Sequence, residues 1–319
     1  MAGASETPAS PLDAIETRRV VVFLVVAFGV SWAVGGYIAL TGGLESDAVL
    51  LSGTPVTRTL VLLAVGYMWG PAVGNVVARL ATGEGRANLY LQPRIRRGWP
   101  YWLAAWLLPV ALTLVGAAVY FGVLGEFSLV AVEGLYAQFV DATGVQLPGG
   151  ATGFVALQVG QAILLAPLIN SLFAFGEEFG WRGYLLPKLL PLGERRAALA
   201  VGVVWGVWHW PIIAMRYNYG SNYPGAPWLG LLAMVWFSVA TGVFLDWVTL
   251  RGASVWPAAI GHAAINGIAG LGLFFVEGNP LLVLGPAPTG VVASIAWTLL
   301  AVWIVLDPER LRSRLDSTT

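Results

Sequence analysis

The segment FVALQVGQAILLAPLINSLFAFGEEFGWR, residues 154–182, carries no charged side chain from Phe154 to Gly176 and then places Glu177, Glu178 and Arg182 close together. A helix needs about 20 mostly apolar residues to cross a bilayer, and this run provides that length. Ionisable side chains at such a place are costly and usually functional. The segment therefore predicts a transmembrane helix that ends in a charged group.

The composition of the whole chain agrees with a membrane protein. Hydrophobic residues make up 57% of the 319 residues and charged residues 11%, whereas soluble domains carry about 25% charged residues. The mean hydropathy is +0.75. Tryptophan, enriched at membrane–water interfaces, occurs 15 times, and no cysteine is present for disulfide or thiol chemistry. The formal net charge is zero, and we expect no nucleic-acid partner.

Eight apolar runs are long enough to cross a membrane, which predicts an all-α, polytopic transmembrane helical bundle. They lie at about 20–41, 60–81, 100–124, 154–176, 197–216, 228–249, 254–275 and 288–306. We therefore expect a transmembrane domain over 20–306, between a disordered tail at 1–19 and a short tail at 307–319.

The basic residues predict the orientation of this bundle. With eight spans, fifteen of the seventeen Lys and Arg residues fall on one side, and only Arg58 and Arg216 fall on the other. Cytoplasmic loops of membrane proteins carry the excess of Lys and Arg. Both termini are therefore expected in the cytoplasm, with the chain in the cell membrane.

The two histidines of the chain both lie within apolar runs. His209 lies in VVWGVWHWP, and His262 lies in GHAAINGIAG, four residues before Asn266. Residues four apart share one face of a helix, so His262 and Asn266 point the same way and could stabilise a developing oxyanion.

The same spacing sorts the charged residues. Glu178 and Arg182 are four apart and can form an intrahelical ion pair, while Glu177 is rotated by about 100° and is freer to face a cavity as a general base. The small-residue pairs Gly176/Gly180 and Gly202/Gly206 are expected to bring Glu177 and His209 together by close helix packing.

Each of these three sets of polar residues also has a purely structural interpretation, without a catalytic role. The charged residues could be interfacial side chains at a helix end, His209 a packing residue at a kink before Pro211, and His262 with Asn266 an interhelical hydrogen-bonding pair. Asp246, near Arg251 in the sequence, is interpreted as structural.

The three groups together resemble the motifs of the CPBP family, which contains type II CAAX prenyl endopeptidases and bacteriocin-processing and immunity proteins. They are Glu177-Glu178-x-x-x-Arg182, Trp205-x-x-x-His209 and His262-x-x-x-Asn266. The resemblance covers roughly residues 155–275. Trp205 stands where the family commonly has Phe, a departure expected to change little because both rings are large and apolar.

The resemblance implies an intramembrane endopeptidase that acts on a membrane-associated peptide or protein. Glu177 would activate water, His209 would help to hold it, and His262 with Asn266 would stabilise the oxyanion. Glu178 and Arg182 would support the site. With sixteen Arg and one Lys, the chain suggests a GC-rich prokaryotic genome, in which a prenylated substrate is doubtful.

Two alternatives stay open at this point. The family is often labelled a metalloprotease, and Glu177, His209 and His262 could form a zinc site; the absence of H-E-x-x-H and the spacing of His262 with Asn266 favour a metal-free reaction with no cofactor. A membrane transporter or a non-catalytic membrane scaffold with a buried polar network is the alternative function.

Overall fold

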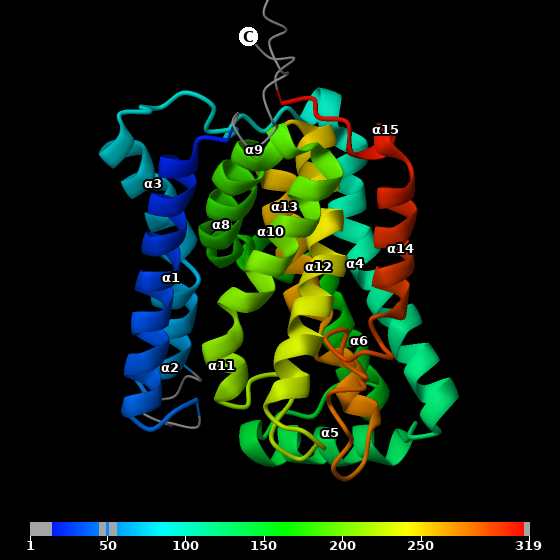
Figure 1. Cartoon of the computed structure of the whole chain (residues 1–319). Helices are drawn as coiled ribbons and strands as arrows, with labels where there is room; N and C mark the ends of the chain where they lie inside the picture. The colour runs from blue at the N-terminus through cyan, green and yellow to red at the C-terminus, as the bar shows by residue number, and fades with distance from the viewer. Residues whose placement is uncertain (1–14, 45–48, 51–55, 316–319) are drawn as a thin grey trace, which may run out of the picture.

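The computed structural model describes residues 15–44, 49–50 and 56–315, and the bundle it shows is built from helices (Figure 1). Residues 1–14 and 316–319 of the two predicted tails lie outside the described residues. No strand occurs in the described residues, where an isolated bridge joins Val49 and Thr57. The predicted all-α class is confirmed.

The helices follow one another along the chain with short connections. They are α1 (Thr17–Leu40), α2 (Arg58–Val61), η1 (Leu62–Tyr67), α3 (Gly70–Thr82), α4 (Ile95–Leu124), α5 (Leu129–Thr143), α6 (Gly150–Leu164), α7 (Ala166–Ile169), α8 (Ser171–Gly180), η2 (Trp181–Leu185), α9 (Leu186–Leu189), η3 (Leu190–Leu192), α10 (Glu194–Trp208), α11 (Trp210–Ala214), α12 (Trp228–Gly252), α13 (Trp256–Ile268), η4 (Leu271–Phe275), α14 (Ile295–Leu306) and α15 (Pro308–Leu311).

Within the described residues, six helical stretches are long and apolar enough to cross a membrane. They are Thr17–Leu40, Arg58–Thr82, Ile95–Leu124, Gly150–Ile169, Trp228–Gly252 and Trp256–Phe275. The predicted spans at 197–216 and 288–306 are formed by shorter helices, α10 with α11 and α14. The chain is a membrane protein, while the count of eight spans stays a prediction.

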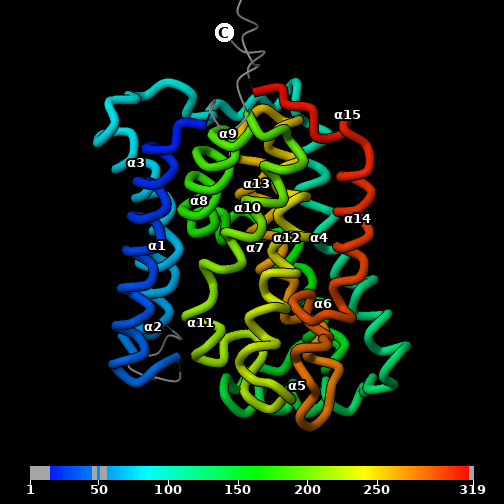
Figure 2. The backbone as a smooth tube through the Cα atoms, viewed as in Figure 1, coloured from blue at the N-terminus to red at the C-terminus, as the bar shows by residue number. Residues whose placement is uncertain are grey.

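The predicted span at 154–176 is divided, and proline explains where. Pro167 has no N–H to donate to the carbonyl of Ile163, four residues earlier, so the helix is interrupted there. The indole Nε1 of Trp106 on α4 donates to that carbonyl instead, at 2.7 Å. The tube in Figure 2 shows α7 between α6 and α8. Glu177 and Glu178 therefore lie on the separate helix α8, inside the bundle.

The two ends of the described chain lie at the same end of the bundle (Figure 1). There Glu84, in the loop after α3, contacts Lys188 at 2.7 Å, Arg79 at 3.6 Å and Arg19 at 3.7 Å. Burial raises the pKa of Glu84, but its contacts with Lys188 and Arg79 lower the pKa by more, to below the ordinary value. We call this the basic end, and α5 lies across the opposite end (Figure 1).

The orientation can be tested with single cysteines, because the native chain has none. We expect Thr318→Cys to be protected from an impermeant thiol reagent in intact cells and Ser221→Cys to react, since the excess of basic residues marks the cytoplasmic side. Reaction of Thr318→Cys from outside intact cells, with Ser221→Cys protected, would reverse the predicted orientation.

Candidate active site

The charged residues of the first motif are fully inside the protein. Glu177 is 2% exposed, and Glu178 and Arg182 are 0% exposed, so they are not interfacial side chains reaching toward water. Immediately after α8, the chain widens into the π-helix η2, which contains Arg182. Single π-turns are frequent at functional sites because they re-aim one side chain within a helix.

Arg182 joins two carboxylates from different helices. Its Nη1 lies 3.0 Å from Oε2 of Glu178, and its Nε donates to Oδ1 of Asp246 on α12 at 2.9 Å. Its Nη2 donates to the carbonyl of Gly242 at 3.4 Å. A guanidinium has five N–H donors in a planar fork, which suits this division between partners. The predicted Glu178–Arg182 pair is therefore present, with a third member.

Asp246 is the residue that the sequence interpretation missed. It was assigned a structural place beside Arg251, but Arg251 donates to the hydroxyl of Tyr101 at 3.1 Å and to the carbonyl of Glu309. Asp246 is 0% exposed and is paired with Arg182. The available signal was an acidic residue inside an apolar run, which at that depth requires a partner.

Glu178 connects this group to the third motif. The Nδ1 of His262 on α13 lies 2.7 Å from Oε1 of Glu178. A carboxylate oxygen only accepts, so Nδ1 carries the proton in this contact. The opposite nitrogen, Nε2, then accepts a hydrogen bond if the ring is neutral and donates one if the ring is an imidazolium. The predicted role of His262 as an oxyanion donor thus requires the imidazolium.

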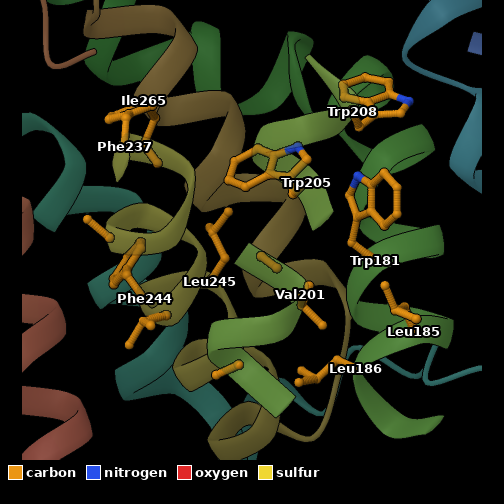
Figure 3. Close-up of a cluster of buried hydrophobic side chains, with 14 of the residues drawn as sticks. Trp181, Leu185, Leu186, Val201, Trp205, Trp208, Phe237, Phe244, Leu245 and Ile265 are labelled. Atoms are coloured by element: carbon orange, nitrogen blue, oxygen red, sulfur yellow. The ribbon is translucent and has the colours of Figure 1, made fainter. Parts of the chain in front are cut away.

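Trp205 is the residue around which the motifs meet. Its indole Nε1 donates to Oε2 of Glu177 at 2.7 Å. Its ring centre lies 5.5 Å from that of His209 and 5.3 Å from that of His262, and the Arg182 guanidinium stacks on it at 4.7 Å. Figure 3 shows Trp205 at the centre of a buried cluster, between Trp181 and Leu245.

The tryptophan at position 205 therefore adds a hydrogen bond that the phenylalanine common in the family cannot make. A phenylalanine would supply the ring but not the N–H that holds Glu177. The size and polarity of the ring do not predict this hydrogen bond, because it joins residues that are 28 positions apart in the sequence.

His209 lies where α10 ends. The helix stops at Trp208, and the N–H of Ile212 donates to the carbonyl of His209. The carbonyl of Trp208 instead accepts the Tyr67 hydroxyl and the Trp32 indole. The predicted kink is thus present, and α1 and η1 hold it from outside.

The orientation of the His209 ring follows from one contact. Its Nδ1 lies 2.8 Å from the carbonyl oxygen of Trp205, which can only accept, so Nδ1 is the protonated nitrogen. Nε2 is left with its lone pair, which can accept a hydrogen bond from water. This is the arrangement that a water-holding histidine needs.

The glycine pairs do not bring α8 to α10, contrary to the prediction. A Cβ on Gly176 or Gly180 would lie 2.8 Å from the Trp69 ring and 2.4 Å from Pro71, so this pair lets α8 approach the start of α3. Gly202 and Gly206 face Val239 and Val235 on α12 in the same way. Trp205, a large residue, is what bridges Glu177 and the histidines.

Asn266 is the predicted site residue that lines an open cavity. Its side chain is exposed and lines a cavity of about 480 Å³ between α6, α7 and α13. Glu177, His209 and His262 are not among the residues that line this cavity. Asn266 follows His262 by one turn of α13, so the cavity borders the buried cluster without containing it.

Zinc requires three ligands that converge on one point at about 2.0–2.2 Å from each donor atom. In the described part of the chain, no group of three His, Cys, Asp or Glu residues is arranged to hold a metal ion. The Trp205 indole already takes one oxygen of Glu177. In this arrangement Glu177, His209 and His262 do not fit a zinc ion.

Part of the chain is similar in sequence to known proteins. Residues 158–268 match the family model of the type II CAAX prenyl endopeptidase Rce1-like proteins. The resemblance to the CPBP family is confirmed. A stretch of 93 residues is 30% identical to CAAX prenyl protease 2 of Methanococcus maripaludis, over 28% of this chain and 34% of that protein. The match to that relative thus covers about a third of its length, and residues 158–268, which match the family model, contain all three motifs.

A matched pair of substitutions tests the role of Trp205. We expect Trp205→Phe to lower turnover by roughly 10- to 100-fold, because a hydrogen bond to a charged group contributes about 1.5–3 kcal/mol. Trp208→Phe is the control, since Trp208 is equally buried but its indole nitrogen has no hydrogen-bond partner. Equal losses of turnover in the two variants would show that Trp205 acts by volume alone.

Proposed function

We propose that this protein is an intramembrane endopeptidase of the cell membrane that hydrolyses a peptide bond in a membrane-associated peptide or protein. The observation that carries the proposal is the buried cluster in which one tryptophan contacts Glu177, His209 and His262. The match of residues 158–268 to prenyl endopeptidases supports hydrolysis as its chemistry.

In the proposed reaction, the Glu177 carboxylate accepts a proton from a water molecule that also donates a hydrogen bond to Nε2 of His209. The resulting hydroxide attacks the carbonyl carbon of the scissile peptide bond, and the carbonyl oxygen becomes an oxyanion. Glu177 then gives its proton to the leaving nitrogen as the C–N bond breaks. General-base help of this kind contributes about 10²–10⁴-fold to a rate.

The oxyanion is stabilised by His262 and by Asn266, which follows it by one turn of α13 at the border of the cavity. His262 donates from Nε2 as an imidazolium, whose Nδ1 is held by Glu178. Arg182 pairs with both Glu178 and Asp246, so the contact with His262 gives Glu178 a second partner that can carry a positive charge. Donors aimed at a developing oxyanion contribute about 10²–10³-fold each.

The physiological test compares the peptides of cells that carry the wild-type protein or the Glu177→Ala variant. We expect fragments of one or a few membrane-associated proteins to disappear in the variant, with the intact precursors accumulating. Identical peptide sets at equal protein levels would favour the transporter or scaffold alternative instead.

Metal dependence is tested on the purified protein. We expect chelation to leave most of the activity and zinc content to stay well below one equivalent, because the mechanism assigns every step to side chains. Stoichiometric zinc, with complete inactivation by a chelator and recovery on adding zinc, would overturn the metal-free mechanism.

A further inference from the structure

The cavity beside Asn266 has a distinctive lining. Four carboxamide side chains face it, and the rest of its wall consists of alanine, glycine and larger apolar residues. The carboxamides are Gln158, Gln161, Asn170 and Asn266. Its lining contains no Asp, Glu, Lys, Arg or His.

These carboxamides have no hydrogen-bond partner in the parts of the chain that the structure describes. Gln158 and Gln161 belong to the membrane-spanning stretch Gly150–Ile169, and Asn266 belongs to Trp256–Phe275. At that depth an unsatisfied polar group is costly, so such side chains line a polar cavity or meet a ligand. Each carboxamide offers two N–H donors and one oxygen acceptor, and none offers a charge.

The lining selects the chemistry of the ligand. A prenyl or acyl chain has no hydrogen-bonding groups and would leave the carboxamides unpaired. A terminal carboxylate or a lipid phosphate would need a cation, which the lining lacks. An extended polypeptide backbone presents alternating N–H and C=O groups without charge, and a carboxamide can pair with both.

The position of the cavity also limits the substrate. α13 begins near the basic end, where Trp256 donates to the carbonyl of Leu91, and it runs past His262 and Asn266 away from that end. α6 begins at the opposite end, where α5 lies (Figure 1). The cavity therefore lies in the half of the bundle away from the basic end, and it borders the catalytic cluster at Asn266.

We propose that this cavity binds an extended, uncharged stretch of a membrane-embedded polypeptide on one side of the scissile bond. The proposal rests on the proposed endopeptidase function and names its substrate class. At helical rise, the interrupted stretch from Gln158 on α6 to Asn170 after α7 would span about 18 Å, which matches about five extended residues. The substrate segment must unwind to reach these carboxamides, because a helical segment already uses its backbone groups.

Binding can be measured without cleavage in full-length Glu177→Gln protein in lipid nanodiscs, with a photo-crosslinking residue at Leu165, a lining position. The probe is a biotinylated synthetic transmembrane peptide with a central Gly-Ser-Gly-Ala-Ser stretch. Two matched peptides carry a central Asp or an uninterrupted Leu helix. We expect the Gly-Ser-Gly-Ala-Ser peptide, which is uncharged and unwinds easily, to crosslink at least tenfold more than either matched peptide. An unlabelled copy of the same peptide should reduce this crosslinking by competition.

The carboxamides are tested by the double variant Gln158→Leu/Gln161→Leu, with Gln138→Leu on α5, outside the cavity, as control. In otherwise wild-type protein, losing two hydrogen bonds should raise KM roughly tenfold with kcat nearly kept. The control should leave both constants unchanged.

The outcomes separate the two proposals. Crosslinking of the neutral peptide without any cleavage by the wild-type protein would sink the endopeptidase function and keep the peptide site. Cleavage with equal crosslinking of all three peptides, or with a KM unchanged in a folded double variant, would overturn the peptide site. Crosslinking to lipid alone would show that lipid occupies the cavity, and it would also overturn the peptide site.

Discussion

The Glu177→Gln variant is expected to lose turnover by roughly 10²–10⁴-fold on a fluorogenic membrane peptide, the range typical of losing a general base. The substitution removes the group that accepts the proton of water while it keeps the size of the side chain. The carboxamide oxygen of glutamine can still accept the Trp205 indole hydrogen bond, so the cluster should keep its geometry.

This expectation separates chemistry from binding. Glu177 is not among the residues that line the cavity beside Asn266, where we propose that the substrate binds. The KM of the variant should therefore stay close to that of the wild type. Thermal unfolding in detergent serves as the control for folding. A folded Glu177→Gln protein that cleaves at the wild-type rate would show that another group activates the water.

Helical spacing and the cost of membrane-buried charge predicted much of the site. The Glu178–Arg182 pair follows from a spacing of four residues, and the burial of His262 and the partial burial of His209 follow from their apolar surroundings. The class of fold follows from the length of the apolar runs. All of these depend on neighbours in the sequence, and for that reason one sequence suffices.

The contacts that were missed join residues distant in the sequence. Nothing in the Trp205 or Asp246 segments indicates that one meets Glu177 and the other Arg182, because both contacts depend on how α8, α10 and α12 pack. The interruption of the helix at Pro167 could be predicted, because proline has no N–H to donate. The carbonyl that it frees finds Trp106, a partner that only tertiary packing provides.

Arg182→Met is expected to destabilise the protein by about 3–5 kcal/mol, the usual consequence of removing one member of a buried ion pair. Glu178 and Asp246 are both 0% exposed, and in the variant they would remain as two buried carboxylates without their cation. The Arg182 guanidinium also stacks on Trp205, so its loss loosens the ring that holds Glu177. We expect low expression and a lower midpoint of thermal unfolding in detergent.

The triple variant Arg182→Met/Glu178→Gln/Asp246→Asn distinguishes charge from packing. It removes all three charges while it keeps similar volumes, and replacing a complete buried ionic group by neutral residues is often tolerated. Most of the lost stability should therefore return, yet activity should stay low, because His262 would hydrogen-bond a neutral carboxamide and lose the carboxylate that favours its imidazolium. If the triple variant recovers both stability and turnover, Glu178 has no part in the stabilisation of the oxyanion, and His262 must donate by another route or not at all.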